Sequence, residues 1–278
     1  MKKFLLILFC IIFFSVNADA AIKVTPTVIE MDTKNARSNY VTSSFNVQGG
    51  ENETIRFKIY PEYFKITSQG TMAMLEKSTA QDSLINNIKF VPSEFTLQNG
   101  RTQKVRLTIT DFDKLPDGES RLVLFLEDVA AKEVMLPSGN RNVTTKLLVK
   151  TRVGIPVYLD KGHVSKKGEI DLFKTEQQGE KLICNMKILS DGNSKIRYSG
   201  KAQIIKGRTL IDEKPINNNV VGAKNFLLTN EILPTDKITE DGEYKVRLLL
   251  NYKDENGKIK NLIKESTVTI TKTKEASM

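Results

Sequence analysis

The sequence is poor in the residues that build metal and redox sites. Among its 278 residues there are one His, two Cys and no Trp. One His excludes His-rich metal sites, and two Cys exclude a disulfide scaffold and a Cys-based zinc cluster. The sequence also lacks a glycine-rich phosphate loop and the D-x-[DN]-x-[DN]-G pattern of a calcium loop. These absences exclude much enzyme chemistry and predict a protein that uses no metal and no cofactor.

What is present is typical of a globular protein. Hydrophobic residues make up 40% of the chain and charged residues 27%, with a formal net charge of +9. A disordered chain would be less apolar. At roughly 100–200 residues per domain, the length predicts about two domains.

Residues 1–20 have the pattern of a secretory signal peptide. Lys2 and Lys3 form a short positive start, residues 4–16 are almost entirely apolar, and Ala-Asp-Ala at 18–20 is a small-x-small cleavage site. The alternative is a membrane anchor, but the apolar run is shorter than the ~20 residues of a spanning helix. We therefore expect cleavage after residue 20 and export.

Cleavage would remove Cys10 and leave Cys184 as the only thiol. The mature protein therefore cannot form an internal disulfide and must rely on its hydrophobic cores. No later apolar run approaches spanning length, so no membrane span is expected in the mature protein. An exported basic protein is not expected to meet nucleic acid. Acidic surfaces, envelope polymers or other exported proteins are the expected partners.

Alternating apolar and polar residues dominate the rest of the chain, which predicts β-strands. Turn signals such as Gly49-Gly50, Asn99-Gly100 and Asp254-Glu-Asn-Gly257 separate them. Residues 121–126 are apolar on both faces, which predicts a central strand. Only residues 80–87 resemble a short helix. The alternating segments are 22–28, 45–47, 55–59, 105–109, 182–188, 196–204 and 244–250.

The pattern breaks at Asp160-Lys161-Gly162-His163 and then restarts. We therefore predict two domains, 21–159 and 160–278, after the signal peptide. Many short strands with turns between them favour sandwiches over βαβ units. The predicted fold class is all-β, with two Ig-like β-sandwich domains.

Two residues deserve a test as catalytic groups. His163 lies at the predicted boundary, without a nucleophile motif such as G-x-S-x-G in the sequence. Cys184 alternates with Leu182, Met186 and Ile188, so we predict a buried apolar residue instead of a nucleophile. An enzyme, such as an envelope hydrolase, is therefore not the favoured interpretation.

Three segments of the first half, at residues 91–107, 114–120 and 150–159, are VPSEFTLQNGRTQKVRL, KLPDGES and KTRVGIPVYL. Together they resemble the PapD-like family of periplasmic pilus-assembly chaperones. VPSEFTLQNGRTQKVRL at 91–107 resembles the family's P-x-x-F-x-L-x-P-G-x-x-Q-x-V-R-[LIV] segment. KLPDGES at 114–120 is similar to K-L-P-x-D-R-E-S, and KTRVGIPVYL at 150–159 resembles the long strand that ends the family's first domain. Order and approximate spacing are kept, and the resemblance covers about residues 22–159.

The resemblance implies two Ig-like domains in an L shape and a periplasmic location. It implies a chaperone that lends its last strand to pilus subunits, completing their open sheet by β-augmentation. Pilin-like subunits and an outer-membrane usher are the implied partners. Such an edge is an aggregation hazard, which self-association could shield. The candidate lending residues share one strand phase and are Val143, Thr145, Leu147 and Val149, with Lys146 and Lys150 in the other phase.

The sequence departs from the family where the client's terminal carboxylate is bound. The family places a basic residue in its first strand and a Lys near the end of the last strand of domain one. The corresponding residues here are Val28 and Gly154. Arg152 would share the strand face of Gly154 and could substitute through bidentate bonding, with Lys23 as a weaker second candidate. The alternative for Arg152 is an ordinary solvated charge.

One further interpretation stays open at this stage. Tandem Ig-like domains also build structural or adhesive envelope proteins that have no chaperone role. A chaperone should be a periplasmic monomer encoded beside usher-like and pilin-like genes, whereas an adhesin should remain at the surface or in polymers.

Overall fold

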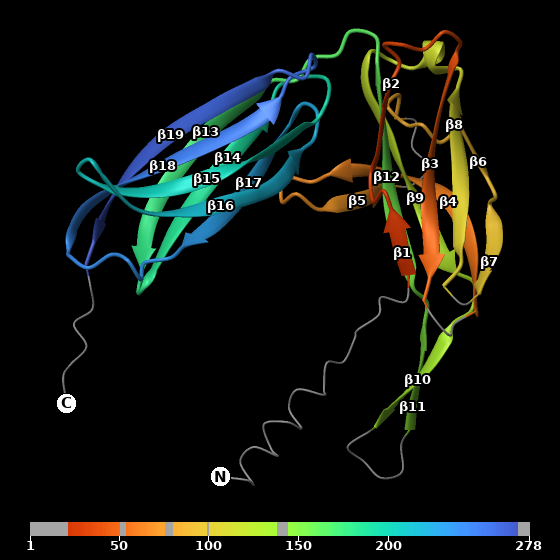
Figure 1. Cartoon of the computed structure of the whole chain (residues 1–278), viewed down its shortest axis with the longest axis horizontal. Coiled ribbons are helices and arrows are strands. Elements are labelled where there is room, and N and C mark those ends of the chain that lie inside the picture. The colour runs from red at the N-terminus through yellow and green to blue at the C-terminus, as the bar shows by residue number, and fades with distance from the viewer. Residues whose placement is uncertain (1–21, 51–53, 76–79, 99, 138–143, 272–278) are drawn as a thin grey trace, which may run out of the picture.

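The computed structural model shows a chain built almost entirely of strands in two bodies set at an angle (Figure 1). It describes residues 22–50, 54–75, 80–98, 100–137 and 144–271. The predicted signal peptide lies outside these residues. Within the described part of the chain, the one helical element is a 3-10 turn at Phe112–Lys114, and no helix is long and apolar enough to cross a membrane. The all-β fold class with two β-sandwiches is confirmed.

The first sandwich packs a four-stranded sheet of order β1-β3-β8-β6 against a sheet of order β2-β12-β9-β4-β5, in which β7 also pairs with β4. A two-stranded ribbon, β10-β11, extends from it. The bounds are β1 Ile22–Thr25, β2 Ile29–Asp32, β3 Tyr40–Gly49, β4 Thr54–Ile66, β5 Met72–Leu75, β6 Ile88–Val91, β7 Glu94–Gln98, β8 Thr102–Thr110, β9 Gly118–Asp128, β10 Lys132–Pro137, β11 Thr144–Val149 and β12 Arg152–Lys161.

Alternation and burial agree in this sandwich. Val105, Leu107 and Ile109 on β8 are fully buried, whereas the residues between them are more exposed. β9 lies between β12 and β4 and is buried on both faces, as predicted from its continuous apolar run. The core of the sandwich therefore follows directly from the strand pattern.

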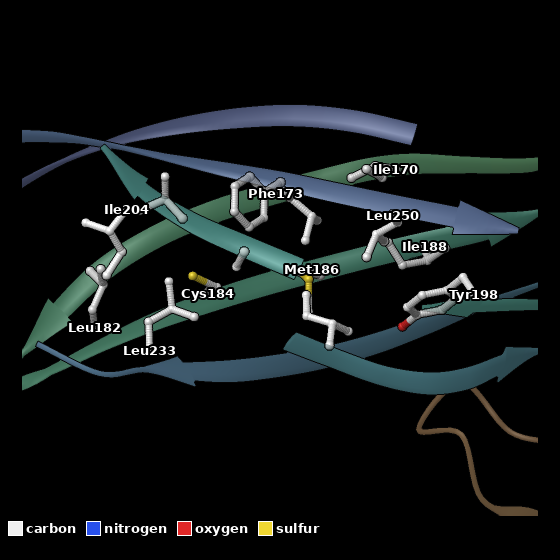
Figure 2. Close-up of a cluster of buried hydrophobic side chains, with 14 of the residues drawn as sticks. Ile170, Phe173, Leu182, Cys184, Met186, Ile188, Tyr198, Ile204, Leu233 and Leu250 are labelled. Carbon is white, nitrogen blue, oxygen red and sulfur yellow. The ribbon is translucent and has the colours of Figure 1, made fainter. Parts of the chain in front are cut away.

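The second sandwich packs a sheet of order β13-β14-β17 against one of order β16-β15-β18-β19. Its core contains Cys184, which lies among Leu182, Met186 and Leu233 in Figure 2 and is fully buried. The bounds are β13 Gly168–Gln178, β14 Lys181–Ser190, β15 Ile196–Lys206, β16 Thr209–Val221, β17 Asn225–Leu233, β18 Gly242–Lys253 and β19 Ile259–Ile270.

The short helix expected at 80–87 is wrong. Residues 80–87 form turns and a single bridge between Ser83 and Arg121. Arg121 donates its N–H to the carbonyl of Asp82, and its own carbonyl accepts from the N–H of Leu84, which is fully buried. Pairing with β9 therefore overrides the weak helical pattern.

The sequence pattern favours one long strand over residues 144–159, interrupted by Gly154 and Pro156. The structure instead interrupts it at 150–151. Gly154 and Pro156 both lie inside β12. Pro156 precedes Val157, where pairing with β2 begins, so it lies in a stretch with one strand neighbour. A missing N–H is tolerated at such an edge. β12 ends at Lys161 and β13 begins at Gly168; independent folding of residues 21–159 and 160–278 stays a prediction.

Candidate functional site

The β10-β11 ribbon continues β9 and β12 beyond the end of the first sandwich (Figure 1). Its register pairs Lys132 with Val149 and Leu147 with Val134. Among the described strands, β11 pairs only with β10. On β12, pairing with β2 begins at Val157, so the earlier residues also have one strand neighbour. The chain thus presents an open strand edge along β11 and the start of β12.

Three of the four predicted lending residues, Thr145, Leu147 and Val149, lie on this ribbon. Side chains of Leu147 and Val149 are 46% and 38% exposed. Thr145 is the register partner of Leu136 on β10, and Val143 lies outside the described residues. Leu148, in the other phase, is also exposed at 62%. The structure therefore brings Leu147 and Val149 of the predicted strand to the surface.

The two faces of the ribbon differ in charge. Lys146 forms an ion pair with Glu133 at 2.6 Å, and Lys150 approaches Glu127 at 3.7 Å. On β12 the odd-numbered Ile155 and Leu159 belong to the core. Within β11, Leu147 and Val149 share one phase, and Lys146 and Leu148 share the other.

Arg152 lies on the face of β12 opposite to Ile155 and contacts Phe125. Its guanidinium carbon is 4.2 Å from the centre of the Phe125 ring, and Nη1 is 3.8 Å from Oε1 of Glu62. Tyr60 donates its hydroxyl to Glu127 at 2.6 Å. Hydrogen bonding with Tyr60 and the nearby carboxylates keep the pKa of Arg152 above its ordinary value. Arg152 is half exposed and charged, with acidic neighbours already beside it.

The other residues of the predicted carboxylate site are arranged as follows. Val28 packs beside the apolar cluster that contains Phe125, and Gly154 faces the Phe125 ring. Lys23 is exposed on β1, which belongs to the opposite sheet from β12. The structure therefore does not bring Lys23 and Arg152 onto one sheet face. Arg152 is the anchor candidate that shares the face of Gly154.

An ion network joins the two sandwiches. The alternation of apolar and polar residues in the sequence did not predict this network. Lys195 of the second sandwich lies 3.2 Å from Glu119 and 3.3 Å from Glu30, both of the first. Its ammonium also lies 3.6 Å from the centre of the Tyr158 ring. Arg197 reaches Glu30 at 2.8 Å. Burial raises the pKa of Glu30, but Lys195 and Arg197 more than offset this, so its pKa lies below the ordinary value.

The network extends into the first sandwich through Arg121. Its guanidinium contacts Glu119 at 3.2 Å and also pairs with Asp82, which accepts a hydrogen bond from the Tyr63 hydroxyl. Glu119 is fully buried and Lys195 nearly so. The signal in the sequence was a pair of charged residues, Glu119 and Arg121, at the start of a strand buried on both faces. Buried charges require partners.

Close backbone contact accompanies these ion pairs. Glu119 donates its N–H to the carbonyl of Asn193 at 2.9 Å. Gly118 has φ of +105°, and a Cβ atom there would lie 2.6 Å from the same carbonyl oxygen. Only glycine fits both the backbone conformation and the space at this position.

The two candidate catalytic residues are not arranged for chemistry. Burial raises the pKa of Cys184 to about 12, so its thiol stays protonated and poorly nucleophilic. His163 is exposed in the connection between the sandwiches, where its carbonyl accepts from Asn193. The described ranges contain no group of three or more His, Cys, Asp or Glu that could hold a metal ion.

Comparison with known proteins gives matches among solved structures only; no family model and no curated protein matches the chain. The class 5 fimbriae chaperone CfaA is similar at 13% identity, with a TM-score of 0.43 over 88% of this chain and 98% of that one. The CsuC-CsuE chaperone and tip adhesion subunit complex of Acinetobacter baumannii gives 13% identity and a TM-score of 0.44, over 91% and 100%. The E. coli chaperone DraB gives 13% and 0.41, over 88% and 96%. Each of these three solved structures is named as a chaperone or contains one.

Proposed function

We propose that this protein is a periplasmic chaperone that binds pilus or fimbrial subunits by lending them a strand. The observation that carries the proposal is the open edge of β11, on which Leu147 and Val149 are exposed in one strand phase. Exposed apolar residues on an open edge are an aggregation hazard unless a partner covers them. A subunit that lacks its last strand would supply that cover.

In the proposed complex the client pairs its open strand edge with β11. Main-chain hydrogen bonds would supply affinity, and Leu147 and Val149 would fill the client's groove. Lys146 and Lys150 are paired with Glu133 and Glu127 in the opposite phase, so the charged face stays out of that groove. The mechanism is binding without bond making or breaking. Residues 1–20 would direct export to the periplasm and be cleaved there, and pilin-like subunits and an usher are the proposed partners.

The test uses two charge substitutions at neighbouring positions. Leu147→Asp would bury an unpaired carboxylate in the client, costing several kcal/mol, whereas in the free protein this side chain faces solvent. Leu148→Asp adds the same charge on the opposite face and is the matched control. We expect a pilin-like subunit encoded beside this gene to co-purify from the periplasm with wild type and Leu148→Asp, and not with Leu147→Asp.

The other outcomes are informative. Loss of binding in Leu148→Asp alone would place the client on the other face of the ribbon. A lower melting temperature for Leu147→Asp would show that Leu147 belongs to the core. Absence of any bound subunit, with the protein found in surface polymers, would favour the structural or adhesive alternative.

A further inference from the structure

A second connection between the two sandwiches lies away from the chain that links them. β4 and β5 form a hairpin arm, residues 63–75, that reaches toward the second sandwich in Figure 1. Its turn is closed by hydrogen bonds from the Thr67 N–H to the Thr71 carbonyl and between the two Thr hydroxyls, each 2.8 Å long. The arm therefore has a defined tip that can carry a contact.

The tip binds the start of β17 through two hydrogen bonds. The N–H of Leu228 donates to the carbonyl of Ser68 at 2.7 Å, and Nδ2 of Asn225 donates to the carbonyl of Ile66 at 2.7 Å. β17 is an edge strand that pairs only with β14 among the described strands, so it has a free edge to offer. The first of these contacts joins backbone to backbone, as in a sheet.

Apolar packing supports the two hydrogen bonds. Ile66 is only 7% exposed although it lies next to the tip of the arm. A Cβ atom on Gly222 would be in van der Waals contact with Ile66, at 3.4 Å, and Val220 packs against the cluster that contains Ile66. Gly222 and Val220 belong to the second sandwich. The arm contact therefore buries apolar surface as well as pairing polar groups.

We propose that the β4-β5 arm is a brace that fixes the angle between the sandwiches. The ion network around Glu119 and Lys195 holds the two sandwiches together next to the linker. The arm adds an attachment on β17 made of different residues. Ile66, Ser68 and Asn225 act as positioning residues, since they hold the second sandwich relative to the face that carries Arg152.

The effect of the brace on client binding rests on the proposed function. The brace would act by raising the fraction of molecules that have the interdomain angle a client fits. A client that fits one interdomain angle binds more weakly when only a fraction of molecules have that angle. Removing the brace should therefore weaken client binding without changing the lending strand. Interdomain distances report the brace itself and require no client.

The experiment measures those distances by spin labelling. Cys184 is fully buried, so labels can be placed at Lys89→Cys on β6 and Thr267→Cys on β19, both exposed. Asn225→Asp removes the Nδ2 donor while keeping the Oδ1 that accepts from the N–H of Phe226. Asn230→Asp makes the same charge change on the same strand, at an exposed position away from the arm, and is the matched control. A second variant replaces residues 68–70 by Asn-Gly to shorten the tip.

We expect a narrow distance distribution for the parent and for Asn230→Asp, and a broad one for Asn225→Asp and the shortened arm. Each sample must show the parent's circular dichroism spectrum, and the shortened arm carries the test if Asn225→Asp does not fold. Client affinity should fall about fivefold or more, the lower end of typical coupling between sites. An unchanged distribution in the shortened arm overturns the brace whatever the client affinity does. If the parent binds no pilin-like subunit, the proposed function fails while the distances still test the brace.

Discussion

The ring of Phe125 occupies the space that a side chain at Gly154 would need, because a Cβ atom on Gly154 would lie 3.1 Å from Cε1 of that ring. Val123 leaves no more room, with Cγ2 at 3.0 Å. Gly154 on β12 and Phe125 on β9 are register partners. The absence of a basic residue here is therefore built into the packing of the sheet.

Gly154→Lys should lower the free energy of unfolding by about 1–3 kcal/mol, the usual cost of overpacking. Adding Phe125→Ala should make the Lys substitution less costly, because the ring no longer opposes it. Thermal unfolding of the two single variants and the double variant measures this coupling. Full additivity of the two substitutions would show that the ring moves aside freely.

Arg152→Ala should weaken binding of a client with a free terminal carboxylate by about tenfold, or about 1.4 kcal/mol, and leave an amidated client unaffected. A half-exposed guanidinium on the face of Gly154 is the physical reason. Lys23→Ala, in the opposite sheet, should change neither affinity. Titration calorimetry can compare both client forms. Equal binding of the two forms by wild type would make Arg152 an ordinary surface charge.

Lys195→Met should destabilise the protein by about 2–3 kcal/mol, because it leaves the buried Glu119 with Arg121 as its remaining ion-pair partner. The matched control is Lys201→Met, which breaks an ion pair with Glu213 whose partners are both over 40% exposed and should cost less than about 1 kcal/mol. Urea unfolding measures both. Similar losses in the two variants would contradict the role of burial.

Cys184 should make the protein less stable at alkaline pH. Its pKa is raised to about 12 in the folded state, against about 8.5 in the unfolded chain. Stability is therefore fully present below about pH 8.5 and is lost as pH rises toward 12, by up to about 1.4 kcal/mol per pH unit. The free energy of unfolding is measured against pH for wild type and for Cys184→Ala. The difference between the two slopes separates the effect of Cys184 from the deprotonation of lysines. Rapid labelling of native Cys184 by a thiol reagent would contradict its burial.

Cys184→Ser should cost about 1–3 kcal/mol at neutral pH, because it buries a hydroxyl among apolar side chains. Cys184→Ala separates this polar cost from the loss of volume. Binding of a client should survive in the Ser variant at temperatures where it is folded.

The strands and the core were predictable because alternation is local. The burial of Val105, Leu107 and Ile109, and of Cys184 with its neighbours, follows from period two. The ribbon could be predicted only as part of one long strand, since its break at 150–151 carries no Pro or Gly. Lys195 and Glu119 are 76 residues apart, and no local pattern pairs them. The arm contact likewise depends on how two complete sandwiches meet.

The backbone of Gly118 has a consequence for how this protein can evolve. Any other residue there would place its Cβ atom 2.6 Å from the Asn193 carbonyl oxygen and would have to adopt a positive φ. Every substitution at this position therefore disturbs the junction between the sandwiches. Substitutions of Gly118 therefore cannot change the interdomain geometry in small steps. Small steps remain possible at the tip of the arm, where Gln69 is exposed and a loop can gain or lose residues one at a time. Divergence in interdomain geometry should thus accumulate in loop length, while residue 118 stays fixed.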